Sequence, residues 1–255
     1  MRNVDVIIQA RMGSTRLPGK VLREVLGRPL LAYQIERVQR FACLRTLVVA
    51  TSDLPGDDPV AELGRKLGVR VYRGSENDVL DRYYQAAREI GSETVMRLTG
   101  DCPLVDAASC DRVVAEFFRQ GLEHVCTGKS YAEGLDCEVF SFALLEEVWK
   151  RAEKAFEREH VTSYVRNNPG VFRSAYVENE VDDSRYRITV DEPEDFEVVR
   201  AVFEALYPLH GADFGMERIR PFLDGHSEIF NLNSHVVRNE AVVKAIARGE
   251  IPPRP

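Results

Sequence analysis

Short apolar segments alternate with amphipathic segments along the first half of this chain, and this alternation limits the fold more than any other feature. Val4 to Ala10, Thr46 to Ala50 and Thr94 to Thr99 are rich in aliphatic or β-branched residues and are predicted to be strands. Helices are predicted from Pro29 to about Arg40 and from about Ala107 to Gln120. Because strands separated by helices pair in parallel through crossovers, an α/β domain with a largely parallel sheet is expected.

The second half of the chain is more mixed and is expected to complete the same domain. With 255 residues and 44% hydrophobic residues, the chain is long enough for one large domain. We divide it into a main domain over residues 1–210 and a C-terminal helical extension over 211–255; within the first, residues 129–136 are loosely patterned, like an insertion over a site. The clearest further patterns predict strands at Cys137 to Phe140, Val171 to Val177 and Arg187 to Val190 and a helix near Glu240 to Arg248.

The first predicted strand leads directly into a loop that is rich in small residues, hydroxyls and cations. The loop reads Arg11-Met12-Gly13-Ser14-Thr15-Arg16-Leu17-Pro18-Gly19-Lys20. Its glycines let backbone amides approach phosphate oxygens closely, and its hydroxyls and cations supply further hydrogen-bond donors. We interpret the loop as a cradle for a nucleoside triphosphate. A glycine- and proline-containing turn with solvated cations is the alternative.

The loop does not match a P-loop. A P-loop has four residues between its first glycine and the Gly-Lys pair, and a Ser or Thr after the lysine. Here five residues separate Gly13 from Gly19, and Val21 follows Lys20. The hydroxyl that holds magnesium in a P-loop is therefore absent.

The charge balance favours a small polyanion as the ligand. The net charge is -7, which argues against a general nucleic-acid binder, because such a protein needs a basic face. The run from Arg11 to Arg28 is a local exception, with five basic residues and one acid, Glu24. A focused basic patch in an acidic protein suits a compact polyanion, since a long one would be repelled elsewhere.

Cysteine use and hydropathy predict a cytoplasmic protein without a membrane segment. No apolar run approaches the length of a membrane helix, and the N-terminus passes into the first strand without a signal-like leader. The five cysteines are scattered and form no Cys-x-x-Cys pair, so reduced thiols are expected instead of a zinc site or a disulfide framework: Cys43, Cys102, Cys110, Cys126 and Cys137.

Two aspartates stand where predicted strands end. Asp101 follows Thr94 to Thr99, and Asp191 follows Arg187 to Val190. Open α/β sheets bind ligands at this edge, and nucleotidyl transfer needs hard oxygen ligands for a divalent metal, so the two carboxylates are candidates for one shared ion. Helix capping is the ordinary alternative. It is strong for Asp191, because Glu194 lies three residues later as in a capping box.

His160 is the histidine with the most informative surroundings. It lies in the sequence Glu157-Arg158-Glu159-His160. It can bind a substrate carboxylate or hydroxyl, or pair with acids on a helix surface at neutral pH. The sequence alone leaves both readings open.

Six ordered blocks of the sequence resemble the acylneuraminate and KDO cytidylyltransferase family, and within it the spore-coat polysaccharide branch called SpsF. The likeness covers residues 4 to about 206. The blocks are Ile7 to Lys20, Arg73 to Tyr83, Arg97 to Leu104, Gly134 to Phe140, Arg158 to Thr162 and Thr189 to Phe196.

The resemblance implies a single-domain nucleotidyltransferase fold, Rossmann-like and similar to GT-A, that couples CTP to a sugar acid of the 2-keto-3-deoxy or nonulosonic type and releases pyrophosphate. It implies Mg²⁺ bound by Asp101 and Asp191, and catalysis by these two residues with Lys20 and Arg16. Substrate-binding candidates are Arg97, Asp136, Glu138 and His160. Nucleotide-binding candidates are Gln9, Ala10, Arg11, Gly13, Ser14, Thr15, Arg16, Lys20, Thr51, Asp78, Arg82, Thr99 and Gly100.

The resemblance also implies a homodimer, with residues 129–168 as the dimerisation arm and an insertion in the main domain. Two other classes of function stay open at this point. One is a GT-A-like glycosyltransferase that uses a nucleotide sugar, although its usual Asp-x-Asp pair does not occur here. The other is a nucleotide-binding protein without turnover, which would not need both aspartates.

Overall fold

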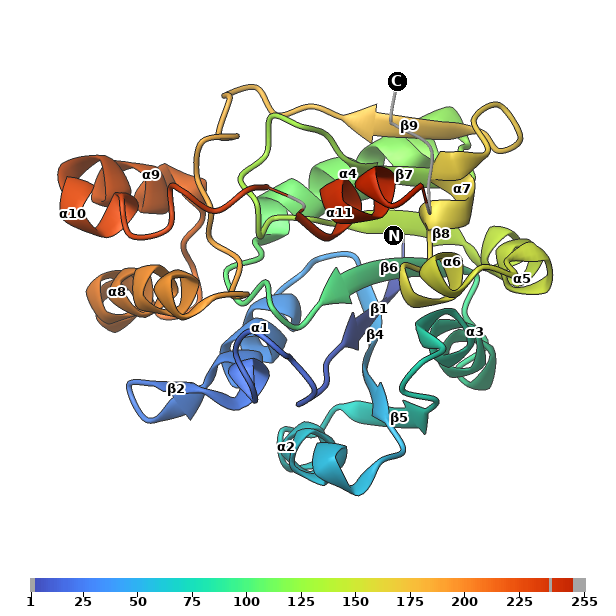
Figure 1. The fold of residues 1–255 in the computed structure, drawn as a ribbon, viewed down its shortest axis with the longest axis horizontal. Helices are drawn as coiled ribbons and strands as arrows, with labels where there is room; N and C mark the ends of the chain where they lie inside the picture. Colours follow the sequence, from blue (N-terminus) through green and yellow to red (C-terminus); the bar gives the residue numbers. More distant parts are fainter. Residues whose placement is uncertain (1–2, 239, 250–255) are drawn as a thin grey trace.

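Seven strands form the central sheet in the order β5-β4-β1-β6-β8-β7-β9. The computed structural model describes residues 3–238 and 240–249 (Figure 1). Strands β5, β4, β1 and β6 are parallel, β8 runs antiparallel to β6 and β7, and β9 is parallel to β7. The strands are β1 (Val4–Gln9), β4 (Leu44–Ser52), β5 (Arg70–Gly74), β6 (Thr94–Thr99), β7 (His124–Thr127), β8 (Glu138–Ser141) and β9 (Ser174–Val177), with β2 (Glu24–Val25) and β3 (Arg28–Pro29) in a separate hairpin.

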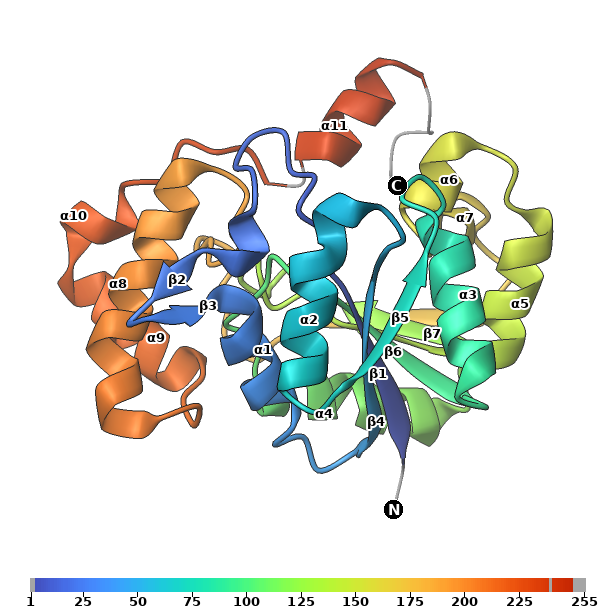
Figure 2. The same cartoon turned by 90° about the horizontal axis from the view of Figure 1, so that it is seen from below.

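Helices cover both faces of the sheet and extend the molecule at one end (Figures 1 and 2). The helices are α1 (Leu30–Val38), α2 (Asp58–Lys66), α3 (Val79–Glu89), α4 (Ala107–Gln120), α5 (Phe142–Arg151), α6 (Ala155–Glu159), α7 (Ser163–Asn167), α8 (Pro193–His210), α9 (Met216–Gly225), α10 (Ser227–Phe230) and α11 (Glu240–Ala247), with short 3-10 turns at Lys20–Leu22 and Pro55–Asp57. The mixed α/β sheet predicted from the alternating pattern is confirmed.

The period of two in β1 creates the two core layers. Val6 and Ile8 point to one face and pack in a cluster with residues of α1, α2 and α4. Ile7 points to the other face, in a cluster with residues of α3, α5 and α7. All three side chains are fully buried. Burial of a large aliphatic side chain contributes roughly 1.5–3 kcal/mol, so both faces of this strand stabilise the sheet.

Residues 187–190 do not form the last strand that their pattern predicts, which is a correction. The segment runs between two loops: Ile188 N donates to Glu133 O (2.7 Å), and Val190 N donates to Asp101 O (2.8 Å). Its apolar side chains, Ile188 and Val190, are buried in the cluster that α8 and α9 form. The pattern therefore correctly indicates that Ile188 and Val190 are buried, although the backbone of this segment pairs with loops and not with the sheet.

Residues 129–168, the predicted insertion in the main domain, contribute strands and helices to the body of that domain. β8 lies between β6 and β7, inside the sheet, and α5 packs against α3. Segments 142–151 and 24–29 form a helix and a hairpin that the sequence patterns did not predict. The role of residues 129–168 in dimerisation stays a prediction.

Residues 211–238 and 240–249, the described part of the predicted C-terminal extension, contain three helices. α9 and α10 pack on α8, and the predicted helix near residues 240–248 is α11. Residues 250–255 of this extension lie outside the described residues. Among the residues that the structure describes, no helix has the length and apolar character needed to cross a membrane.

Candidate functional site

A cavity of about 410 Å³ opens at the carboxyl ends of β1 and β6. Figure 2 shows the loop after β1, α6 and α11 gathered at this end of the sheet. This is the edge at which open α/β sheets bind ligands. The cavity is lined by Gln9, Ala10, Arg11, Gly13, Ser14, Thr15, Arg16, Lys20, Val21, Val79, Arg82, Thr99, Gly100, Asp101, Glu159, His160 and Asp191.

The loop after β1 folds back on itself and presents its polar groups to the cavity. Gly19 has a φ of +67° and its N donates to Met12 O at 3.1 Å, which closes the loop. Only glycine adopts this left-handed conformation without strain. The N of Met12 donates to Asp57 Oδ1 at 2.6 Å and fixes the other side of the loop. The predicted phosphate cradle is therefore a closed loop on the cavity wall.

Asp101 and Asp191, ninety residues apart in the sequence, meet in space. The Lys20 Nζ lies 2.9 Å from Asp101 Oδ2 and 2.7 Å from Asp191 Oδ1, so one cation bridges both carboxylates. The backbone bond from Val190 N to Asp101 O brings the two chain segments together. The predicted convergence of the two acids is confirmed, with the Lys20 ammonium between them.

Gly134 permits a close backbone contact with the segment that precedes Asp191. A Cβ on Gly134, whose φ is +110°, would lie 2.5 Å from the backbone N of Thr189. No side chain fits at that distance, so the loop that carries Gly134 presses directly on the segment that leads to Asp191. This glycine belongs to one of the blocks that resemble the family, and its physical role is to permit that backbone contact.

Asp101 and Lys20 each stabilise the ionised form of the other. Burial by itself raises the pKa of Asp101, but the Lys20 ammonium and the Thr99 hydroxyl outweigh it and lower the pKa to about 2. Burial lowers the pKa of Lys20, but the charges of Asp101 and Asp191 raise it above its ordinary value. Both side chains are therefore ionised across the neutral range.

Asp191 does not cap the following helix. The capping box of α8 joins Glu192 and Asp195: the N of Glu192 donates to Asp195 Oδ2 at 2.9 Å. Asp191 lies one residue before this box, and its carboxylate instead contacts Arg16 at 3.2 Å and Arg187 at 3.2 Å, besides Lys20. The capping alternative therefore applies to the neighbouring residues, and the Asp191 oxygens stay in the site.

The donor set at Asp101 and Asp191 fits a hard divalent cation. Two ionised carboxylates, with the Thr99 hydroxyl bonded to one of them, offer the oxygen ligands that Mg²⁺ prefers. The Lys20 ammonium already bridges the carboxylates, which shows that the position accepts positive charge. A metal there has to displace the ammonium from at least part of its contacts.

The loop cations are paired with acids throughout the site. Arg16 contacts Glu192 at 2.8 Å and Glu240 at 3.4 Å, in addition to Asp191. Arg11 lies 3.5 Å from Glu76 and 3.7 Å from Glu159. A polyanion that enters the cavity would have to replace these acidic side chains as the partners of Arg11 and Arg16.

Arg82 differs from the other cavity cations because no described carboxylate lies within ion-pair distance of it, although the charges of Asp57 and Glu76 act on it from farther away. The residue is 1% exposed, its Nη1 donates to the Ser75 carbonyl at 3.0 Å, and its buried Nε has no hydrogen-bond partner in the described part of the chain. A buried guanidinium without a paired acid keeps hydrogen-bond donors that a ligand can use. It is suited to hold acceptor groups of a ligand.

Several predicted site residues lie outside the cavity lining. Asp78 caps α3 and forms an ion pair of 2.5 Å with Arg158. Thr51 is fully buried. Asp136 accepts from Gly134 N at 3.1 Å. The residues placed away from the lining are Thr51, Asp78, Arg97, Asp136 and Glu138, whereas all four residues predicted to be catalytic, and His160, line the cavity.

Glu138 is enclosed by protein groups. Arg97 and Arg166 lie 3.0 and 2.6 Å from its carboxylate oxygens. Burial by itself raises the pKa of Glu138, but the charges of these two arginines lower it to about 2. Because both oxygens are bound by protein donors, Glu138 shapes the wall behind the cavity and is not free to bind a substrate.

A three-residue group around Glu138 has the composition of a metal site but lies beside two arginines. His124, Cys126 and Glu138 place ligand atoms within 4.8 Å of one another, and all three are buried. The guanidinium groups of Arg97 and Arg166 on Glu138 repel a further cation, so the charges around this group disfavour a metal ion.

His124 makes stability depend on pH. Burial lowers its pKa from 6.5 to about 4, so below pH 6.5 the unfolded chain binds a proton that the folded chain does not. The free energy of unfolding should therefore fall as the pH decreases, by about 2 kcal/mol from this group between pH 7 and pH 5. Urea titrations of the wild type and His124→Leu at both pH values measure this. The variant should lose less stability; an equal loss in both proteins would contradict the assignment.

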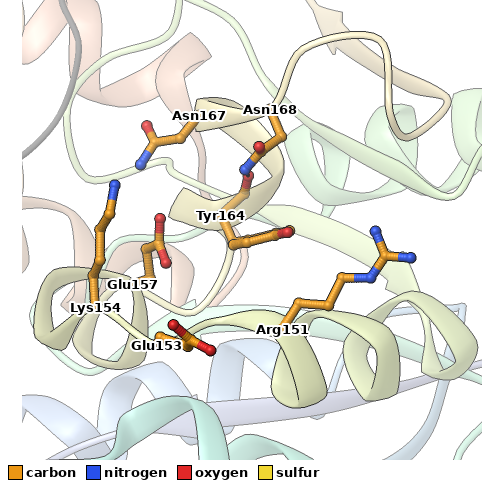
Figure 3. Close-up of a pocket in the computed structure, with 7 residues that line it drawn as sticks. All are labelled: Arg151, Glu153, Lys154, Glu157, Tyr164, Asn167 and Asn168. Atoms are coloured by element: carbon orange, nitrogen blue, oxygen red, sulfur yellow. Dashed lines mark hydrogen bonds between the residues drawn. The ribbon is translucent and has the colours of Figure 1, made fainter.

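A second hollow, of about 330 Å³, is lined by residues in and beside α5, α6 and α7. Figure 3 shows Lys154, Glu157 and Tyr164 projecting into it. None of the predicted site residues lines this hollow. We place the candidate site in the cavity at the ends of β1 and β6.

Sequence reasoning missed some residues of the site. Val21 and Glu159 line the cavity, and Arg166 supports its wall. Val21 directly follows the block that ends at Lys20, and Glu159 lies inside a block, next to His160, so the motif blocks could have indicated both. Arg166 follows the last of these positions by six residues, and nothing in its spacing indicates a bond to Glu138.

Comparison with known proteins places the chain in a family. The model of the cytidylyltransferase family matches residues 6–212. An uncharacterized protein of Methanocaldococcus jannaschii is 38% identical over 90% of this chain and 94% of its own length. The spore coat polysaccharide biosynthesis protein SpsF of Bacillus subtilis is 37% identical over 80% of this chain and 88% of its own. A 3-deoxy-manno-octulosonate cytidylyltransferase of Geobacter sulfurreducens is 36% identical over 44% of each chain.

Solved structures agree with this placement. A cytidylyltransferase from Leptospira borgpetersenii superposes with a TM-score of 0.84 and 35% identity over 90% of this chain and 97% of its own. A CMP-2-keto-3-deoxy-manno-octonic acid synthetase complexed with CTP has a TM-score of 0.58 at 18% identity, covering 79% and 98%, and shares the fold. Fold and matches together define a nucleotidyltransferase enzyme. The chain belongs to the cytidylyltransferase family, on the branch that includes SpsF.

Proposed function

We propose that this enzyme transfers CMP from CTP to a sugar acid of the 2-keto-3-deoxy or nonulosonic type, releases pyrophosphate, and serves surface polysaccharide biosynthesis. The convergence of Asp101, Asp191 and Lys20 beside the closed loop carries the proposal. The names of the similar SpsF and 3-deoxy-manno-octulosonate proteins support the nucleotide and the acceptor class. Cytoplasmic location and a homodimer stay predictions; light scattering tests the second.

The loop residues have the first role in the proposed reaction. Arg11, Arg16 and Lys20 bind triphosphate oxygens and stabilise the negative charge that grows on the leaving pyrophosphate. The backbone amides of the glycine-containing loop and the hydroxyls of Ser14 and Thr15 add neutral donors. These groups orient the α-phosphorus towards the acceptor side of the cavity.

Asp101 and Asp191 are the residues that would hold Mg²⁺. When bound there, Mg²⁺ supplies charge neutralisation on the phosphate oxygens. The two carboxylates also position Lys20 by their ion pairs before substrate enters. No covalent enzyme intermediate is needed, because the acceptor hydroxyl attacks the α-phosphorus directly and catalysis rests on positioning and charge.

His160 and the wall behind it form the proposed acceptor side. Burial, with the nearby charges of Arg97 and Arg166, lowers the pKa of His160 to about 4, so the ring is neutral at pH 7. A neutral imidazole offers one donor and one acceptor, which suits sugar hydroxyls.

A screen for pyrophosphate tests the proposed function. CTP, UTP, GTP and ATP are each combined with 3-deoxy-manno-octulosonate, N-acetylneuraminate and a neutral hexose, with Mg²⁺ present. We expect pyrophosphate and a CMP-sugar with CTP and a sugar acid. Release of a free nucleoside diphosphate in a parallel reaction supplied with a sugar nucleotide, or no product with any pair, would contradict the proposal.

Removal of the Arg82 guanidinium should weaken nucleotide binding. In Arg82→Met the KM for CTP is expected to rise at least about tenfold, because a charge-assisted hydrogen bond contributes about 1.5–3 kcal/mol. The KM for the acceptor should change little. Arg88→Met, on the exposed side of the same helix, is the matched control and should keep the wild-type KM. An unchanged KM for CTP in Arg82→Met would remove this residue from the nucleotide site.

A further inference from the structure

The turn after α6 holds a valine in a conformation that valine avoids. Val161 has a φ of +32°; among the described residues the other non-glycine residue with positive φ is Leu26, in the β2–β3 hairpin. Such a backbone is strained for a β-branched residue. Val161 is 1% exposed and belongs to the core cluster that contains Tyr83 and Phe140. Strain of this kind persists only where neighbouring contacts enforce it, and it gathers at functional sites.

The residue before Val161 is His160, which lines the cavity. Its ring packs on Phe156 with centroids 4.2 Å apart, and its carbonyl accepts from Ser163 N at 2.8 Å. Within the described part of the chain, no hydrogen bond to either ring nitrogen is found. The backbone at Val161 thus decides how a ring with two unused nitrogen atoms faces the cavity.

The residue after Val161 is Thr162, which is tied to the sheet. The residue is 1% exposed, and its Oγ1 lies 2.9 and 2.8 Å from the two oxygens of Glu138. Glu138 belongs to β8 and is itself held by Arg97 of β6 and Arg166 of α7. The hydroxyl of Thr162 is therefore bonded to a carboxylate that cannot move away.

We propose that Thr162 and Glu138 form a latch that keeps Val161 in its left-handed conformation and so fixes the His160 ring in the cavity wall. Thr162 and Glu138 are positioning residues, and His160 is the group that meets the ligand. The assignment of that ligand as the acceptor rests on the proposed function. The position of the ring does not depend on it, and can be measured in the free protein.

The matched variants are Thr162→Val, which keeps the shape and loses the hydroxyl, and Thr162→Ser, which keeps the hydroxyl. Proton NMR follows the titration of the His160 ring, assigned with His160→Gln. We expect the His160 pKa to rise from about 4 towards 6.5 in Thr162→Val, as the ring leaves its buried place beside Arg97 and Arg166, and to stay low in Thr162→Ser. An unchanged pKa in a folded Thr162→Val would overturn the latch.

A double variant separates strain from simple loss of packing. Glycine adopts positive φ freely, so with Val161→Gly the turn no longer needs the latch. Adding Val161→Gly to Thr162→Val should return the His160 pKa towards the wild-type value, even if Thr162→Val alone folds poorly. A double variant whose His160 titrates near 6.5 would count against the proposal.

Kinetics link the latch to the acceptor. With CTP and 3-deoxy-manno-octulosonate as the probe, Thr162→Val should raise the KM for the sugar acid at least tenfold, with the KM for CTP within twofold and Thr162→Ser close to wild type. Equal loss for both substrates would indicate a general structural role and would overturn the link. If the wild type does not use this acceptor, the result contradicts the proposed acceptor and not the latch. The NMR titration then still tests the latch.

Discussion

Asp101→Asn is expected to lower kcat at least about 1000-fold, which corresponds to about 4 kcal/mol of lost transition-state stabilisation. The substitution keeps the size of the side chain and removes its charge. Asp101 has its pKa held at about 2 by Lys20 and Thr99, so the wild-type group is a carboxylate at any working pH. Steady-state pyrophosphate release at saturating Mg²⁺ and CTP measures the effect.

The control for this variant is Asp213→Asn. The Asp213 side chain is 80% exposed and forms a surface ion pair with Arg40, so its loss should leave kcat unchanged. Thermal melting of both variants verifies that they are folded. Turnover of Asp101→Asn within a few-fold of wild type would show that this carboxylate is not a required metal ligand.

Lys20→Ala is expected to have two effects of opposite sign. It should lower kcat at least about tenfold, or about 1.4 kcal/mol, because the ammonium no longer stabilises charge on the triphosphate. It should also tighten the binding of a divalent ion to the protein without nucleotide. The ammonium lies 2.9 and 2.7 Å from the two carboxylates proposed to hold the ion, so it should compete with the ion in the wild type.

Titration of the free protein with Mn²⁺, followed by the loss of its free-ion EPR signal, measures the second effect. We expect at least a tenfold lower dissociation constant in Lys20→Ala than in the wild type, and no change in Lys66→Ala, an exposed lysine of α2. Weaker or equal Mn²⁺ binding in Lys20→Ala would show that the ammonium does not occupy the place of the ion.

On the proposed function, these contacts predict that nucleotide and metal bind with positive coupling. A bound triphosphate would attract Lys20 and Arg16 away from Asp191 and so free its oxygens for the proposed ion, and the ion would free the two cations for the triphosphate. Each ligand removes the partner that hinders the other. The wild type should therefore bind Mn²⁺ more tightly with CTP present, and the gain should be smaller in Lys20→Ala.

The fold was largely predictable because local patterns and tertiary structure agree in its first half. β6 spans Thr94–Thr99 and α4 spans Ala107–Gln120, as predicted from apolar spacing and turn residues. Residues 187–190 were predicted to be a strand and are not, because their buried alternation reflects packing against α8 and α9. Periodicity reports which side chains are buried, and it does not identify the partner of the backbone.

The site was predictable where one short segment carries it. The loop from Arg11 to Lys20 lines the cavity as expected, since its glycines and cations act locally. Asp191 was placed in the site on the premise of a sheet edge, whereas the bond from Val190 N to Asp101 O brings it there. Glu138 was expected at the substrate, and the two arginines that enclose it come from distant segments that no spacing rule connects.

A crystal of the enzyme grown with CTP and Mn²⁺ gives the most direct test of the central claim that one divalent ion joins Asp101, Asp191 and the triphosphate. The account predicts an anomalous peak within coordination distance of an oxygen of each aspartate and of a phosphate, with Lys20 moved onto the triphosphate. A metal peak on the phosphates alone, with Lys20 still bridging the two carboxylates, would contradict it.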